Sequence, residues 1–148
     1  MPSFSQRSLA KLETCHEDLQ LIFNDVIWMR DCTIIEGHRG KGRQDELHFL
    51  GKSQLQYPSS KHNHNPSMAV DVMEYFPEKP HIHWLRLDDA EDFAKYVLET
   101  ADRLLDCGDI SHRLRWGGDW NMDGTPVNLD PYEQFFDAPH YELVEIHP

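Results

Sequence analysis

The feature that most constrains this chain is a carboxylate placed inside a short apolar segment. Asp71 lies between Val70 and Val72 in a run typical of a β-strand, so its side chain points to the face opposite the two valines. An ionised carboxylate in such a strand is costly unless a partner stabilises its charge, and a cation is the natural partner. His62 and His64 precede Asp71 by a few residues. The pattern therefore indicates a metal ion as that cation.

A second group of ligand-type residues lies near the end of the chain, where Asp137 precedes His140 by three positions. Two histidines and one aspartate are sufficient to hold a zinc ion with its fourth position open, as in catalytic zinc sites. Such an ion lowers the pKa of a bound water from about 15.7 to about 7. A nearby carboxylate can then accept the proton, and Asp137 is placed to do so. His81 and His83 form another pair, but they have no carboxylate at close spacing and rank lower.

The segment 119–124 has the pattern D-x-N-x-D-G, which opens many calcium-binding loops. Its oxygen ligands would be Asp119, Asn121 and Asp123. The glutamate expected at the twelfth position is replaced by Asp130. A turn stabilised by side-chain hydrogen bonds to the backbone explains the same pattern, so both interpretations stay open.

Composition and charge exclude several classes of protein. A chain of 148 residues suits one domain, here residues 1–148, and its formal charge of −12 disfavours nucleic acid as a partner. No apolar run is long enough to span a membrane, and the first residues lack the apolar core of a secretory signal. Three widely separated cysteines argue against a disulfide framework. We therefore expect a protein that is made in a cytoplasm, does not insert into membranes and is a monomer.

Periodicity predicts an α+β fold with a small, mostly antiparallel sheet flanked by helices. Strands are predicted at residues 32–36, 68–75, 113–116 and 140–146. One amphipathic helix is predicted over residues 8–29 with a break near His16, and another begins at an N-cap at Asp88 and ends at Gly108. Residues 38–61 are polar and contain several glycines, which predicts a long loop with one helical turn near residues 45–50.

Several blocks of the sequence resemble the zinc peptidases of the D-alanyl-D-alanine carboxypeptidase superfamily, which share the Hedgehog fold. Within it the likeness is greatest to phage endolysins that cut the L-alanyl–D-glutamate bond of peptidoglycan stem peptides. The resemblance extends from about Leu9 to Leu143, and its blocks occur in the family's order. They are Ile35-Glu36-Gly37-His38-Arg39 ahead of Gln44, Ser60-Lys61-His62, Ala69-Val70-Asp71, Trp116-Gly117-Gly118-Asp119-Trp120 and Asp137-Ala138-Pro139-His140-Tyr141-Glu142.

The resemblance implies a role for each matching residue. It assigns His62, Asp71 and His140 to zinc and Asp137 to the catalytic base. Arg39 matches an arginine that steadies the substrate carbonyl as it becomes an oxyanion. Two alternatives remain open, because relatives with a shorter interval before the aspartate would use His64 as the first ligand, and Glu142, on the strand face of His140, is a second candidate base. A calcium ion at residues 119–123 is implied only by some endolysins of this type.

The function implied is zinc-dependent cleavage of the L-Ala–D-Glu bond in bacterial peptidoglycan. Such an endolysin would remain in the host cytoplasm until a holin-type protein releases it to the cell wall, where it would lyse the host of the bacteriophage. A D-Ala-D-Ala carboxypeptidase or dipeptidase with the same metal site is one alternative. A zinc-stabilised binding module without catalysis is another.

Overall fold

The computed structural model describes residues 2–127 and 136–146, which form helices and one four-stranded sheet. The longer helices are α1 (Gln6–Leu12), α2 (Glu17–Met29), α3 (Lys41–Phe49) and α4 (Leu87–Asp106). A short 3-10 helix, η1, covers Lys61–Asn63. The strands are β1 (Cys32–Glu36), β2 (Ala69–Glu74), β3 (Arg113–Trp116) and β4 (His140–Val144).

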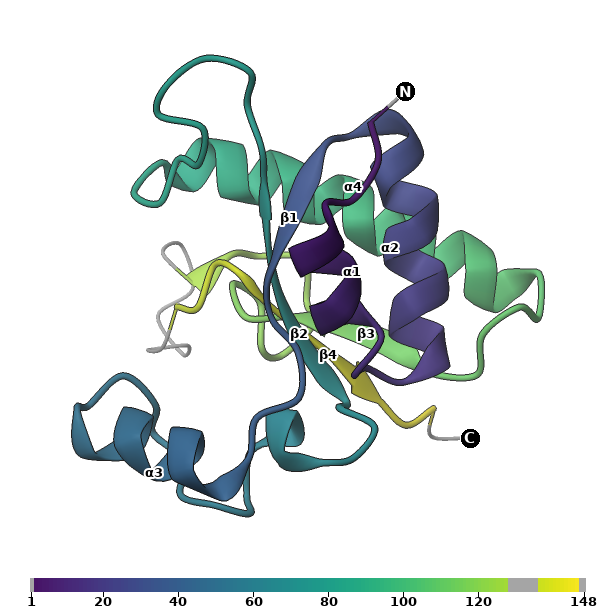
Figure 1. Ribbon diagram of the computed structural model, residues 1–148. Coiled ribbons are helices and arrows are strands. Elements are labelled where there is room, and N and C mark those ends of the chain that lie inside the picture. The colour runs from purple at the N-terminus through teal and green to yellow at the C-terminus, as the bar shows by residue number, and fades with distance from the viewer. Residues whose placement is uncertain (1, 128–135, 147–148) are drawn as a thin grey trace.

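The sheet has the order β1-β2-β4-β3, and every pair of neighbouring strands is antiparallel. Helices α2 and α4 pack together beside the sheet, whereas α3 lies apart from them at the other side (Figure 1). The chain leaves the sheet after β1, forms α3 and η1, and returns as β2. The part of the molecule around α3 is therefore one continuous connection between two adjacent strands, β1 and β2.

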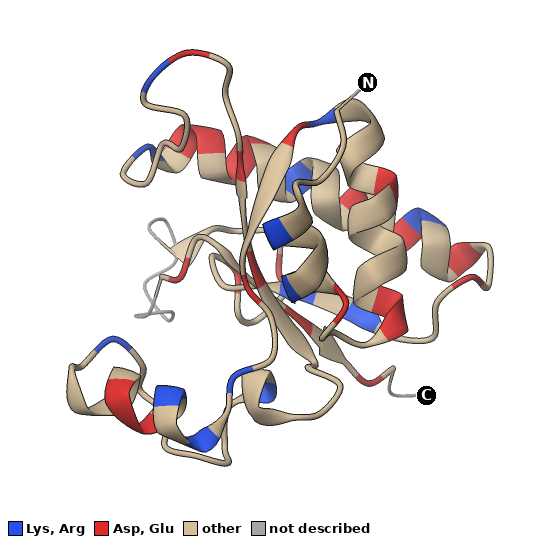
Figure 2. Ribbon diagram, in the orientation of Figure 1, with Lys and Arg blue, Asp and Glu red and all other residues tan. Residues whose placement is uncertain are grey.

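Acidic residues are spread over several elements, among them α2 and α4, rather than gathered in one patch (Figure 2). The region of α3 carries both signs, and a basic segment lies in the turn that follows this helix (Figure 2). Within the described residues, no helix combines the length and the apolar character needed to cross a bilayer.

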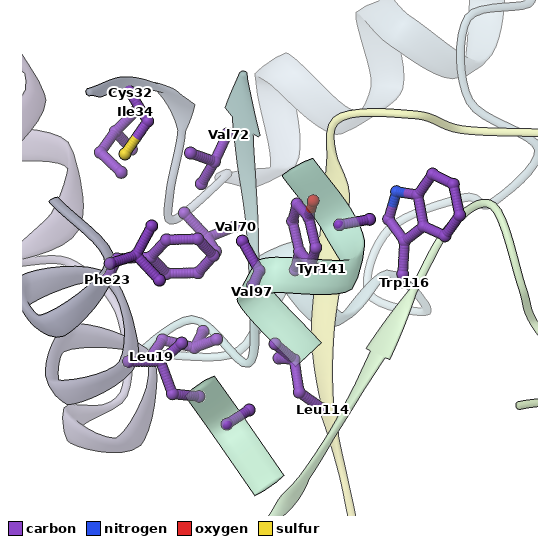
Figure 3. Packing of buried hydrophobic residues seen from close by; sticks show 14 of the residues in the cluster. Leu19, Phe23, Cys32, Ile34, Val70, Val72, Val97, Leu114, Trp116 and Tyr141 are labelled. Carbon is purple, nitrogen blue, oxygen red and sulfur yellow. The ribbon is translucent and has the colours of Figure 1, made fainter. Parts of the chain in front are cut away.

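The core lies between one face of the sheet and the helices α2 and α4 (Figure 3). Alternate strand residues supply it: Val70 and Val72 from β2, and Tyr141 and Leu143 from β4, are all at most 1% exposed. Phe23 of α2 meets the ring of Tyr141 edge to face, with ring centroids 5.6 Å apart. Because strand side chains alternate, the residues between these core positions point to the opposite face of the sheet.

The structure confirms the predicted α+β class, and it places a helix break where the sequence indicated one. His16 is the N-cap of α2, and its Nδ1 accepts a hydrogen bond from the backbone N–H of Asp18 at 3.0 Å. β1 and β3 have the predicted bounds, whereas β2 and β4 are shorter than the predicted strands 68–75 and 140–146.

Two predictions about helices were wrong. Residues 41–49 form a nine-residue helix, α3, in place of a single turn. The predicted N-cap at Asp88 lies inside the first turn of α4, whose N-cap is Arg86. Asp89 accepts a hydrogen bond from His83 at 2.6 Å, so the acidic residues here stabilise the helix start by their charge and by contact with the preceding loop.

Candidate metal centre and active site

The pairing of β2 with β4 brings two of the predicted ligands together. Asp71 lies directly opposite His140 in the register, and both occupy the face of the sheet that turns away from the core. In the same way β3 places Arg115 opposite Glu142 on that face. The side chains of Val70 and Asp71 therefore point to opposite faces of the sheet, as the sequence predicted for Asp71.

His62 reaches the same point from η1. Ser60 caps this short helix, and its side chain and that of Asn63 form a reciprocal capping box. The carbonyl of His62 accepts a hydrogen bond from the backbone N–H of Arg39 at 2.7 Å, and the Asn63 amide donates to the carbonyl of Arg39 at 2.9 Å. These bonds fix the backbone of His62 beside the segment that follows β1, and its side chain is buried.

The three side chains are close enough to share one metal ion. His62 Nε2 lies 3.2 Å from Asp71 Oδ1, and His140 Nδ1 lies 3.3 Å from the same oxygen. One ligand atom from each residue lies within 4.8 Å of those of the other two. Ligands about 2.0 to 2.1 Å from a zinc ion are separated by about 3.3 Å in a tetrahedron, which agrees with the two distances to Asp71. The two histidines and the aspartate are therefore a candidate zinc site.

Each imidazole is oriented through its other nitrogen. His62 Nδ1 lies 2.8 Å from the carbonyl oxygen of Gly37, and His140 Nε2 lies 2.8 Å from Glu142 Oε1. Hydrogen bonds of this kind fix the tautomer and the ring orientation of metal-binding histidines. They leave His62 Nε2 and His140 Nδ1 directed at Asp71.

The carboxylates make this point favourable for positive charge. Burial opposes ionisation of Asp71, but the charges and hydrogen bonds of His62 and His140 outweigh it and hold its pKa far below the ordinary value. Burial likewise opposes ionisation of Glu142, yet hydrogen bonds from His140 and Arg115 lower its pKa to about 2. Burial by itself lowers the pKa of His140. The hydrogen bonds to Asp71 and Glu142 outweigh this effect and raise the pKa of His140 to about 9. A divalent cation held by Asp71, His62 and His140 would supply this positive charge and would hold the imidazole of His140 in its neutral form.

Asp137 lies at the edge of this cluster, just before β4. Its Oδ2 is 4.0 Å from His140 Nδ1, and its side chain is partly exposed. Burial, together with the negative charge of Asp71, raises the pKa of Asp137 above its ordinary value. Gly117 holds the segment in place, because its carbonyl accepts a hydrogen bond from the Asp137 N–H and its N–H donates to the His140 carbonyl, both at 2.8 Å.

Glu142, the alternative base, has a different environment. Its Oε2 lies 2.6 Å from Arg115 Nη2 and 3.3 Å from Lys61 Nζ, and its Oε1 contacts His140 Nε2, the nitrogen on the far side of the ring from Asp71. Both oxygens are therefore engaged, and the geometry suits orientation of His140 better than proton transfer.

Arg39 is buried beside the metal ligands. Its guanidinium donates to Glu36 at 2.7 Å and to the Gln44 side chain at 2.9 Å, and it lies 3.8 Å from Asp71 Oδ2. Its Nε has no hydrogen-bond partner among the described residues. Arg39 thus keeps a donor that is not used within the described part of the protein.

These residues line one cavity of about 590 Å³. Its lining includes sheet residues together with Arg39, His62 and Trp120, whose ring centroid is 5.3 Å from that of His140. Further lining residues come from α3, from the segment that follows it and from η1. They are Leu47, Lys52, Ser53, Gln54, Leu55, Ser59, Ser60 and Lys61. A cavity of this size, with the candidate metal ligands in its lining, can hold part of a peptide.

The other histidines considered as ligands lie elsewhere. His64 is exposed at the end of η1 and does not belong to the cluster. His81 stacks on Tyr75, and its Nδ1 lies 2.8 Å from the Phe76 carbonyl oxygen. His83 contacts Asp89, a carboxylate that is near in space although it is not close in sequence. The structure thus brings His62, and not His64, to Asp71 and His140.

The loop that resembles a calcium site forms a set of local turns. Both carboxylate oxygens of Asp119 accept backbone N–H groups, from Asp123 at 3.3 Å and from Gly124 at 2.8 Å. Asn121 and Asp123 also accept backbone hydrogen bonds within the loop. Asp130 lies outside the described residues. Hydrogen-bonded turns account for the sequence pattern, and calcium binding stays a prediction.

A second cluster, which sequence reasoning missed, joins α2 to the segment before β3. Asp18 Oδ2 lies 2.8 Å from His112 Nδ1 and accepts the backbone N–H of Ser111 at 3.0 Å, while His16 Nδ1 is 3.9 Å from Asp18 Oδ1. One ligand atom from each of His16, Asp18 and His112 lies within 4.8 Å of the others, so this cluster is a second candidate metal site. The contacts of Asp18 with Ser111 and His112 also link α2 to the segment before β3. His112 is too distant in sequence from the other two for spacing to reveal the cluster.

Comparisons with known proteins agree with this geometry. No curated protein matches the sequence. The chain is similar in structure to the Serratia marcescens L-Ala D-Glu endopeptidase ChiX, with a TM-score of 0.68 and 25% sequence identity over 97% of this chain and 91% of that one. Residues 2–144 match the family described as phage L-alanyl-D-glutamate peptidase. Because the match covers nearly the whole sequence, the chain belongs to the phage L-alanyl-D-glutamate peptidase family.

Proposed function

We propose that this chain is a zinc-dependent endopeptidase that hydrolyses the L-Ala–D-Glu bond of peptidoglycan stem peptides. The observation that carries the proposal is the convergence of His62, Asp71 and His140 in the lining of a cavity, with one ligand atom from each within 4.8 Å of the others. Membership of the peptidase family and the similarity to ChiX support the reaction and the bond. The same comparisons favour this function over a D-Ala-D-Ala carboxypeptidase and over a binding module without catalysis.

His62 Nε2, Asp71 Oδ1 and His140 Nδ1 are the atoms proposed to hold the metal. A zinc ion supplies Lewis acidity, which activates water and polarises a peptide carbonyl. The protein keeps the donor atoms in position through Gly37 and Glu142, which hold the far nitrogens of the two imidazoles. Before a cation binds, the charges and hydrogen bonds of His62 and His140 outweigh burial and hold the pKa of Asp71 far below its ordinary value, so its carboxylate is already ionised.

Asp137 is proposed as the base that moves the proton. Its carboxylate takes a proton from the attacking water as the water oxygen bonds to the carbonyl carbon. The same proton then passes to the nitrogen of the scissile bond, so that the C–N bond breaks and a free amino group leaves. The products are a new carboxylate on L-alanine and a free amino group on D-glutamate. A pKa raised by burial makes Asp137 a stronger base than an exposed aspartate.

Arg39 is proposed to stabilise the negative charge that develops on the carbonyl oxygen. Its guanidinium is fixed by Glu36 and Gln44 and lines the same cavity, so little reorganisation is required when charge develops. For the biological role, we propose that the enzyme degrades the cell wall at the end of a phage infection, after release from the host cytoplasm.

The test is a digestion of purified peptidoglycan with product analysis by mass spectrometry. The wild type should release peptides with a free D-glutamyl amino group, and a chelator should stop the reaction. Asp137→Ala should lose about 10²–10⁴-fold in rate while one zinc per chain stays bound. Asp88→Ala, which removes an exposed aspartate on α4, is the matched control and should retain full activity. Release of D-alanine, or chelator-resistant cleavage, would refute the proposal.

A further inference from the structure

The substrate proposed above brings its own negative charge to a cavity whose lining contains several carboxylates. D-glutamate has two carboxyl groups. One of them forms the amide bond to the next residue of the stem peptide, and the other stays free near the scissile bond. The cavity wall already contains four carboxylates, those of Glu36, Asp71, Asp137 and Glu142. A free substrate carboxylate bound here is best stabilised by a cation that is not already paired with one of these groups.

Four basic residues line the cavity, and three of them are already engaged. Arg39 is held by Glu36, Arg115 lies 2.6 Å from Glu142, and Lys61 donates to the Leu143 carbonyl and lies 3.3 Å from Glu142. The fourth is Lys52, whose ammonium group makes no ion pair within residues 2–127 and 136–146. Lys52 is therefore the available cation on this wall.

The backbone of Lys52 is held in a defined position. It follows Gly51, whose φ of 74° turns the chain sharply after α3. The Gly51 N–H donates to the His48 carbonyl at 3.1 Å and the Lys52 N–H to the Leu47 carbonyl at 2.9 Å. This is the Schellman pattern of a helix C-terminus. Lys52 in this turn lines the same cavity as Asp71 and His140.

Gln44 links this turn to the catalytic residues. Its side chain is fully buried, its Oε1 accepts from Arg39 at 2.9 Å, and its Nε2 donates to Ser53 Oγ at 2.9 Å and to the Leu55 carbonyl at 2.5 Å. The same amide thus holds Arg39 and the residue after Lys52. Arg39 and the turn that carries Lys52 are consequently linked through one buried side chain.

We infer that Lys52 binds the free carboxylate of the D-glutamyl residue and makes the enzyme selective for substrates that carry it. This inference rests on the proposed function. It concerns binding of a group beside the reacting bond, so Lys52 determines specificity and takes no part in proton transfer. The alternative substrate, in which the carboxylate is converted to a neutral carboxamide, is expected to bind less well.

The test compares two synthetic peptides that differ only in this group: acetyl-L-Ala-γ-D-Glu-L-Lys and its D-isoglutamine counterpart. The zinc-loaded wild type should prefer the carboxylate by about fivefold in kcat/KM, the upper range for an ion pair open to solvent. Lys52→Met should lower this ratio to about one, mainly through KM, while Lys52→Arg should retain it. Lys41→Met removes a lysine of α3 that lies outside the cavity and should behave like the wild type.

Salt provides a second measurement. Raising the ionic strength from about 0.05 to about 0.5 M should reduce the preference of the wild type and leave Lys52→Met unchanged, because ions screen an exposed pair. An unchanged preference in Lys52→Met, or equal cleavage of the two peptides by the wild type, would overturn the assignment of Lys52 and leave the peptidase proposal intact. Failure to cleave either peptide would refute both.

Discussion

Gly117 offers the most direct test of how the active site is assembled. A Cβ atom at this position would lie 2.3 Å from the carbonyl oxygen of Asp137 and 3.0 Å from the Cβ atoms of Asp137 and His140. Non-bonded heavy atoms are comfortable at about 3.5 Å, so Gly117→Ala must displace the 137–140 segment by about 1 Å. This segment carries both the proposed base and one proposed ligand. A misplacement of that size can reduce catalysis about 100-fold.

The predicted result for Gly117→Ala is therefore a kcat/KM about 100-fold below that of the wild type. Overpacking should also cost about 1 to 3 kcal/mol of stability, so activity is measured well below the melting temperature, with circular dichroism to verify the fold. Gly42→Ala is the matched control. A Cβ at Gly42 meets nothing within 4 Å, and alanine stabilises a helix such as α3 by up to about 1 kcal/mol. A folded Gly117→Ala with wild-type kcat/KM would refute the reasoning.

Three further predictions concern the metal and the fold. Glu142→Gln should weaken zinc binding about 10- to 100-fold, because the substitution removes the charge that orients His140. A chelator competition measures the affinity, and an unchanged affinity would contradict the proposed role of Glu142. Removal of zinc should lower the melting temperature by several degrees, reversibly, since a ligand bound only to the native state stabilises it; calorimetry without a shift would count against the site. Burial opposes ionisation of Asp18, but the hydrogen bonds from His112 and Ser111 outweigh this effect and lower the pKa of Asp18. The ionised Asp18 therefore stabilises the fold above about pH 4, and this stabilisation is lost as the pH falls. Asp18→Asn should thus cost about 1 to 3 kcal/mol at neutral pH and progressively less in acid, as urea unfolding at several pH values would measure.

The sequence was informative wherever strand alternation decided the outcome. Asp71 between two valines predicted a carboxylate on the face opposite the core, and the register with His140 placed it there. The family and the fold class were also predicted, because the short blocks around His62, Asp71 and His140 are specific in order and content. The roles of these residues stay predictions until metal binding is measured.

The sequence was less informative where long-range contacts decided the structure. Helix α3 was missed because Lys41–Phe49 has almost no apolar periodicity, and its buried residues are Gln44 and Leu47. Gln44 is buried because it bridges Arg39 and the 53–55 turn, a contact that no local pattern shows. The orientation of His140 by Glu142 and the link between Asp18 and His112 likewise depend on how separate elements pack.

The division of the cavity between two parts of the chain has a consequence for evolution and for engineering. The hydrolytic groups depend on the strands and on the ends of segments that contact them, whereas much of the remaining lining comes from residues 47–60. Natural variation or grafting within that stretch could change which peptidoglycan is digested, provided that Gln44, which holds Arg39, and Ser60, which caps the helix of His62, are kept. Lytic enzymes directed at different bacteria could be obtained in this way from one scaffold.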